Sequence, residues 1–309
     1  MPPVRSPLVA LAALAVILVV SPAAAQGGEA DAWLVGLTDR VVGDLAAGKP
    51  LVVQVHVPLC ESTIIACGNR KLGNGDVPGD NLYWATDEGF EGWFGRRRSG
   101  WREVLRGDGT TVGEPDVLEV RVWTRAVITP DAWRKRGVGK TYPLYVVAFA
   151  WRGKAIDHAL AVYLDELYGT GTRDLALANA THLAAGGGAQ IVAYTGHNRL
   201  YDVDPPDWAR LERADAPTRG TIAIACNTGP FMADHIAAAQ RVPLVFTRDF
   251  LMASAGAFEG AVLAFANDGT YGAIRMGAAR GYAAAGGQDV NRIGYVFTNP
   301  ADRRWGKWN

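Results

Sequence analysis

IVAYTGHN, residues 191–198, is a short apolar run that passes through Gly196 into His197. TIAIACNTG, residues 221–229, repeats the pattern and ends in Cys226. Short apolar runs of this kind are typical of strands that are buried on both faces. Further runs that predict strands lie at residues 51–59, 117–128, 142–151 and 242–247.

Helical patterns separate these predicted strands. Apolar residues recur at helical spacing in 31–47 and 155–168, and the stretches 232–240 and 251–267 also fit helices. Strands that alternate with helices predict an α/β fold, with a mainly parallel sheet and helices on both faces. We expect residues 26–309 to form a single domain with a long irregular insertion at about 60–113, where glycine is frequent and no period is visible.

Two of the predicted strands end in side chains that can do chemistry. If the strands that lead to His197 and Cys226 are parallel neighbours, both side chains emerge at the same edge of the sheet, where ligands bind in such folds. A thiolate is a nucleophile, and an imidazole can carry the proton to the leaving group. The pair is therefore a candidate for nucleophilic catalysis.

The same residues resemble the caspase-like cysteine peptidases. The segment 194-YTGH-197 looks like the Tyr-Ser-Gly-His-Gly segment of metacaspases, and 225-ACNTG-229 is similar to their Ser-Cys-His-Ser-Gly segment. The resemblance covers residues 142–267 and implies a caspase-like fold and a cysteine endopeptidase with His197 and Cys226 as its dyad. Asn198, where these families usually have glycine, and Ala225 are expected to support the oxyanion.

Other interpretations of these residues stay open. Asp202 and Asp204 follow the histidine and either line a substrate pocket for a basic side chain or are solvated loop residues. Cys226 can also be a packed thiol and His197 a hydrogen-bonded loop residue. The alternative function is a non-catalytic caspase-like domain that acts as an extracytoplasmic binding or scaffold protein through the 60–113 insertion.

The N-terminus predicts export. Arg5 precedes an apolar run at 8–20, and the small residues at 21–25 suit a signal peptidase, so we expect a signal peptide at 1–25 and a periplasmic or extracellular protein. The run is shorter than the roughly 18 to 20 residues that cross a bilayer. A retained membrane anchor is the alternative.

Export changes the interpretation of the three cysteines, because thiols outside the cytoplasm tend to be oxidised in pairs. Cys60 and Cys67 are expected to form a disulfide, which leaves Cys226 unpaired. The alternative is a zinc or copper site formed by His56 with these two cysteines. Asn74, Asp76, Asp80 and Asn81 offer oxygens to calcium, but their spacing fits no EF-hand pattern and surface turns have the same composition. We expect no cofactor and no metal.

The charges balance, with 31 basic and 31 acidic side chains. A near-neutral chain gives no reason to expect nucleic acid or an anionic membrane as a partner. The expected partner is a peptide or protein substrate. Its cleavage preference, any activating cleavage and the oligomeric state have no signal in the sequence.

Overall fold

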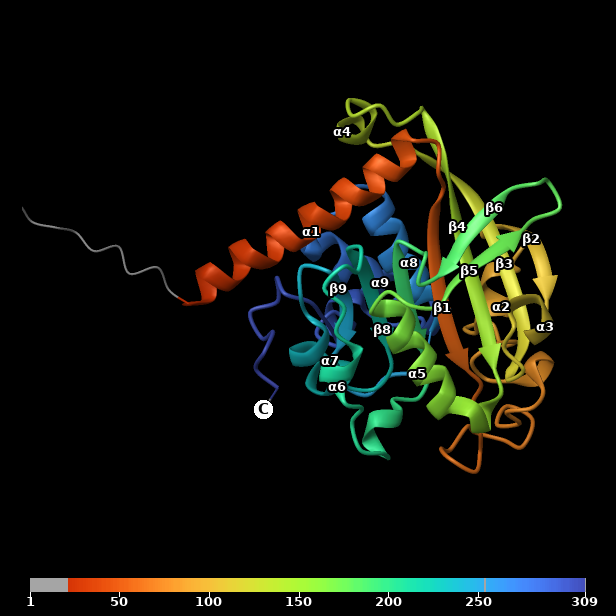
Figure 1. The fold of residues 1–309 in the computed structure, drawn as a ribbon. Coiled ribbons are helices and arrows are strands. Elements are labelled where there is room, and N and C mark those ends of the chain that lie inside the picture. The colour runs from red at the N-terminus through yellow and green to blue at the C-terminus, as the bar shows by residue number, and fades with distance from the viewer. Residues whose placement is uncertain (1–21, 253, 309) are drawn as a thin grey trace, which may run out of the picture.

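A computed structural model of the chain describes residues 22–252 and 254–308. It is built around an eight-stranded sheet of order β10-β9-β8-β7-β1-β4-β3-β2 (Figure 1). Five neighbouring strands are parallel, which confirms the α/β class and the mainly parallel sheet. They are β9 (Arg241–Thr247), β8 (Arg219–Ile224), β7 (Ile191–Thr195), β1 (Leu51–Pro58) and β4 (Thr141–Trp151).

Antiparallel strands complete both edges of the sheet. β3 (Val117–Ile128) pairs with β4, β2 (Arg102–Gly107) pairs with β3, and the short β10 (Phe297–Thr298) pairs with β9. β2 lies inside the 60–113 segment, so that segment is not wholly irregular. Its sequence REVLRG is half polar and leaves most of its side chains at least partly exposed, which explains why no apolar run marked it.

Helices cover both faces of the sheet, as the sequence predicted. Alternation along β7 sends Ile191 and Ala193 into one core and Val192 and Tyr194 into the other. The first core is shared with α1 (Pro22–Ala46), α8 (Ala255–Ala266) and α9 (Tyr271–Gly286), and the second with α5 (Ile156–Leu167) and α7 (Thr228–Ile236). Every residue of β1, β7, β8 and β9 is buried.

The pair α8 and α9 packs through facing glycines. A Cβ on Gly281 would lie 1.9 Å from the carbonyl oxygen of Gly256, and a Cβ on Gly260 would lie 2.1 Å from that of Gly277. Only glycine permits this approach of the two backbones. α9 was not predicted, because it is rich in alanine and glycine and carries a weak apolar stripe.

Smaller elements lie in the connections. A two-stranded hairpin, also missed by the sequence patterns, is formed by β5 (Thr172–Ala176) and β6 (His182–Gly186). The short helices are η1 (Pro78–Asp80), α2 (Phe90–Phe94), α3 (Gly109–Val112), α4 (Asp131–Arg134), η2 (Gly153–Ala155), η3 (Arg199–Tyr201), α6 (Trp208–Leu211) and α10 (Val290–Ile293).

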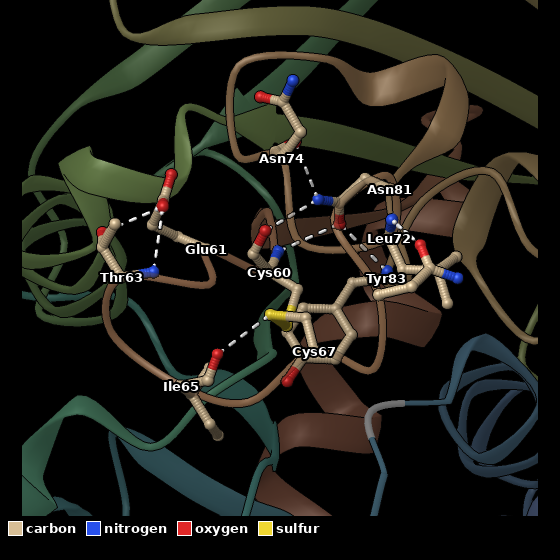
Figure 2. The surroundings of a disulfide bond; sticks show 10 residues. Cys60, Glu61, Thr63, Ile65, Cys67, Leu72, Asn74, Asn81 and Tyr83 are labelled. Carbon is tan, nitrogen blue, oxygen red and sulfur yellow. Dashed lines mark hydrogen bonds between the residues drawn. A yellow bond between two sulfur atoms is a disulfide. The ribbon is translucent and has the colours of Figure 1, made fainter.

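A disulfide between Cys60 and Cys67 closes the first turn of the connection after β1, as predicted (Figure 2). Buried Asn81 binds this turn from the far side of the loop. Its Oδ1 accepts the N–H of Cys60 at 2.9 Å, and its Nδ2 donates to the carbonyls of Cys60 and Asn74 at 2.8 and 3.1 Å. The disulfide and the hydrogen bonds of Asn81 therefore both stabilise the loop.

The predicted signal peptide lies largely outside the described residues, since residues 1–21 are not among them and 22–25 belong to α1. Within the described ranges, none of the helices is both long and apolar enough to cross a membrane.

Candidate active site

The carboxyl ends of the parallel strands converge at one edge of the sheet. β1 lies between β4 and β7. The strands that follow β1 directly in the chain lie on one side of it, and the later parallel strands lie on the other, so the strand order reverses at β1. Open α/β sheets bind ligands at such a switch point. In Figure 1 the arrows of β1 and β4 point to the lower end, where the loop after β1 also lies.

The structure brings the loops that carry His197 and Cys226 to this edge. β7 and β8 are parallel neighbours, and Thr195 is in register with Ile224. His197 and Cys226 each follow two residues later, so they lie at the same level on adjacent connections. The predicted juxtaposition of these two strand ends is confirmed.

His197 is oriented by a carboxylate. Its Nε2 lies 2.6 Å from Oδ2 of Asp202, and its side chain is only 12% exposed. A carboxylate accepts a hydrogen bond, so Nε2 carries the proton and Nδ1 holds the lone pair. Nδ1 is buried and has no hydrogen-bond partner among the described residues. The ring is therefore fixed at one end and free to accept a proton at the other.

Asp202 is itself held ionised. Burial alone would raise its pKa, but the hydrogen bond and charge of His197, together with Arg199, outweigh burial and lower it. Arg199 reaches Asp202 at 3.3 Å and Asp157 of α5 at 2.6 Å. The Asp202 carboxylate is thus already paired with His197 and Arg199. That Asp202 and the exposed Asp204 line a pocket for a basic side chain of the substrate stays a prediction.

Cys226 is a half-buried thiol whose Sγ donates to the carbonyl oxygen of Leu251 at 3.4 Å. Burial raises the pKa of the thiol, and the nearby carboxylate of Asp249 adds to the rise. Across the described part of the chain, no hydrogen bond joins this thiol to either ring nitrogen of His197. The resting thiol is protonated and needs a base to become a nucleophile.

A sharp turn presents the thiol. β8 passes through Cys226 into α7, and Asn227 between them has φ 49°, a left-handed conformation that asparagine tolerates better than most residues. The N–H of Asn227 donates to the carbonyl of Asp249 at 3.2 Å. This strand, turn and helix hold the thiol at the sheet edge.

Asn198 ties the two strand ends together. Its side chain is fully buried, with Nδ2 donating to the carbonyl of Cys226 at 2.8 Å and Oδ1 accepting the N–H of Leu200 at 3.2 Å. The amide group thus positions the backbone of Cys226. Ala225 is buried beside it, and its carbonyl accepts the hydroxyl of Thr247. Direct contact of Asn198 or Ala225 with an oxyanion stays a prediction.

Comparison with models of known protein families, with curated proteins and with solved structures found no match to this chain. The resemblance to caspase-like peptidases therefore rests on the two short segments and on the arrangement at the sheet edge.

Several residues near the thiol were missed by sequence reasoning. Tyr83, from the loop after β1, is buried next to it, and burial together with Cys226 raises the pKa of this phenol to about 12. The hydroxyl of Tyr282 accepts the N–H of Met252 at 3.2 Å. Asp249 and Leu251 follow the end of β9. Because ligand sites lie at the carboxyl ends of parallel strands, this position could have indicated that they belong to the site.

The alternative metal site at His56 is wrong. The two thiols form the disulfide, and the His56 ring lies buried among other partners: Nε2 is 2.8 Å from Glu166 Oε2, and Nδ1 accepts the indole N–H of Trp151 at 3.1 Å. In the ranges that the structure describes, no three His, Cys, Asp or Glu side chains gather as metal ligands would.

Two of the side chains considered for calcium, Asn74 and Asp76, already have partners. Oδ1 of Asn74 accepts the N–H of Asp76 at 3.1 Å, and the Asp76 carboxylate pairs with Arg152. These contacts are those of a folded surface loop.

Proposed function

We propose that this chain is an exported cysteine endopeptidase of caspase-like type, in which Cys226 is the nucleophile and His197 the proton carrier. One observation carries the proposal. Nδ1 of His197, which has no hydrogen-bond partner within residues 22–252 and 254–308, lies buried at the strand end next to that of Cys226, while Asp202 binds the other ring nitrogen. A base with one oriented and one free nitrogen is what a thiol nucleophile requires.

In the proposed reaction, Nδ1 of His197 takes the proton of the Cys226 thiol, and the sulfur attacks the scissile carbonyl carbon. Asp202 stabilises the resulting imidazolium. As the tetrahedral intermediate collapses, the C–N bond breaks and His197 gives its proton to the leaving amine. Water, activated by the same imidazole, then hydrolyses the thioester and restores the thiol. Backbone N–H groups beside Cys226 and Asn198 are proposed to stabilise the oxyanion.

Export is part of the proposal. The Cys60–Cys67 disulfide supports it, because such bonds persist in oxidising compartments, and the N-terminal sequence supports it independently. A catalytic thiol in such a compartment is exposed to oxidation. The burial of Cys226 and its contact with Leu251 protect it in the resting state.

The second candidate function is a non-catalytic binding or scaffold domain. The raised pKa of Cys226 and the direction of its S–H toward Leu251 favour it, because a protonated and engaged thiol is a poor nucleophile. The two candidates differ in whether His197 activates this thiol.

A digest of a peptide library under reducing conditions tests the proposal. The wild type should release fragments, whereas Cys226→Ala and His197→Ala should release none above background. Iodoacetamide kinetics on the folded protein provide the second readout: the wild-type thiol should react faster than in His197→Ala. A thiol that reacts only after denaturation, with no cleavage in the library, would leave the binding domain as the better account.

A further inference from the structure

An apolar rim flanks the candidate thiol. We use this name for three exposed side chains: Tyr201 at the end of η3, and Phe250 and Met252 after β9, with exposed fractions of 41%, 70% and 49%. In the described part of the chain seven large hydrophobic side chains are exposed, and these are three of them. Isolated exposed apolar side chains are ordinary, whereas a group beside a reactive residue indicates a binding site.

Several contacts join the rim to Cys226. Phe250 and Met252 flank Leu251, whose carbonyl accepts the thiol. The hydroxyl of Tyr201 accepts the side-chain amide of Asn227, the residue after the cysteine. The rim therefore borders the position where a bound carbonyl would meet the sulfur.

The rim is also partly ordered in advance. The rings of Tyr201 and Phe250 are nearly parallel, with centroids 6.0 Å apart, and Tyr201 packs on Phe231 at 4.6 Å. Asp249 accepts the N–H of Phe250 at 2.7 Å, so this carboxylate is occupied by its own loop. Stacked aromatic rings offer a rigid surface at low entropic cost, on which another ring gains both contact and geometry.

We infer that the site takes substrates with a bulky apolar side chain, preferably aromatic, on the residue that supplies the scissile carbonyl. This inference rests on the proposed function and names its substrate class. It differs from the prediction of a basic side chain held by Asp202 and Asp204, because Asp202 already pairs with His197 and Arg199. A basic group would have to compete with both partners.

The test uses three acyloxymethyl ketone peptides that differ only in phenylalanine, lysine or glutamate at the carbonyl residue. Each labelling rate of the full chain is divided by its iodoacetamide rate, which reports on the thiol itself. The phenylalanine probe should label at least about tenfold faster than the other two. Phe250→Ser should remove most of this advantage, and the matched variant Tyr295→Ser, which is 49% exposed, should keep it.

Equal labelling by all three probes, with a reactive thiol, would overturn the inference and leave the cysteine peptidase proposal intact. Faster labelling by the lysine probe would overturn it in favour of the acidic pocket. If neither the probes nor iodoacetamide react with the folded protein, the proposed function fails and the substrate class fails with it.

Discussion

The carboxylate of Asp202 lies 2.6 Å from Nε2 of His197, five residues before it in the chain. The short connection through η3 thus brings an acid back onto the imidazole that ends β7. An oriented imidazole presents a single nitrogen to its neighbour, and an ionised partner stabilises the charge that the ring gains on accepting a proton.

Asp202→Asn should lower kcat by about 10² to 10⁴ with a smaller change in KM, because the amide no longer stabilises the imidazolium. Peptide hydrolysis kinetics measure this. Asp204→Asn, an exposed acid in the same loop, is the matched control and should keep its rate. Equal effects of the two substitutions would show that Asp202 acts only through the charge of the loop.

The same pair predicts a pH dependence of stability. The pKa of Asp202 is lowered in the folded chain, so its contribution is present above the unfolded value of about 3.9 and is lost as the pH falls through the folded value. The difference in urea midpoint between wild type and Asp202→Asn should therefore shrink between about pH 5 and about pH 3. A difference that stays constant over this range would contradict a lowered pKa of Asp202 in the folded chain.

Asp249→Asn should make Cys226 more reactive. The Asp249 carboxylate helps to raise the pKa of the thiol, so its removal should lower that pKa and increase the thiolate fraction near neutral pH. The pH profile of iodoacetamide alkylation should shift to lower pH. Asp131→Asn, on the surface helix α4, should leave the profile in place; a shift of equal size in both variants would assign the effect to net charge.

Asn198→Ala should destabilise the fold by about 1 to 3 kcal/mol, since it leaves the carbonyl of Cys226 without its buried donor. Denaturant unfolding measures the loss. Asn179→Ala, at an exposed hairpin turn, removes an amide of the same size without creating a buried unsatisfied group. If both variants unfold at the same denaturant concentration, Asn198 does not clamp the strand ends.

The sequence predicted the parts of the fold that have a strong period. The strand at 117–128 has the predicted limits, and the strands that end before His197 and Cys226 are parallel neighbours. Short apolar runs such as these two are typical of strands that are covered on both faces. β2 and α9 were missed, since polar edge strands and alanine-rich helices carry no clear apolar pattern.

The site was predictable only where strand ends carried reactive residues. Asp202 was noticed, but sequence spacing does not show that a short helix returns its carboxylate to His197. Tyr83 and Leu251 come from loops far from Cys226 in the chain, and their contacts with it depend on loop paths that local patterns do not encode.

A buried carboxylate–histidine pair joins helix α5 to strand β1. Glu166 of α5 is fully buried and contacts His56 of β1 at 2.8 Å and Arg173 at 3.1 Å. The indole N–H of Trp151 can only donate, so Nδ1 of His56 is unprotonated and Nε2–H donates to Glu166. His56 is thus a neutral donor. The cation beside Glu166 is Arg173, which also pairs with Glu114 at 2.6 Å.

Glu166→Ala should therefore cost about 1 to 3 kcal/mol, because it leaves the buried His56 N–H without its acceptor, whereas Arg173 keeps its pair with Glu114 at 2.6 Å. Glu166→Gln should cost less, because its amide oxygen can still accept the His56 N–H. Urea unfolding measures both. Asp174→Ala breaks an acid–histidine pair of similar length on the surface and should change stability little.

His56 is in register with Tyr194, whose hydroxyl donates to the carbonyl of His197 at 2.8 Å, so the destabilised variants should also lose peptidase activity before they unfold. Full activity up to the unfolding transition would show that this buried pair supports the sheet without positioning the histidine.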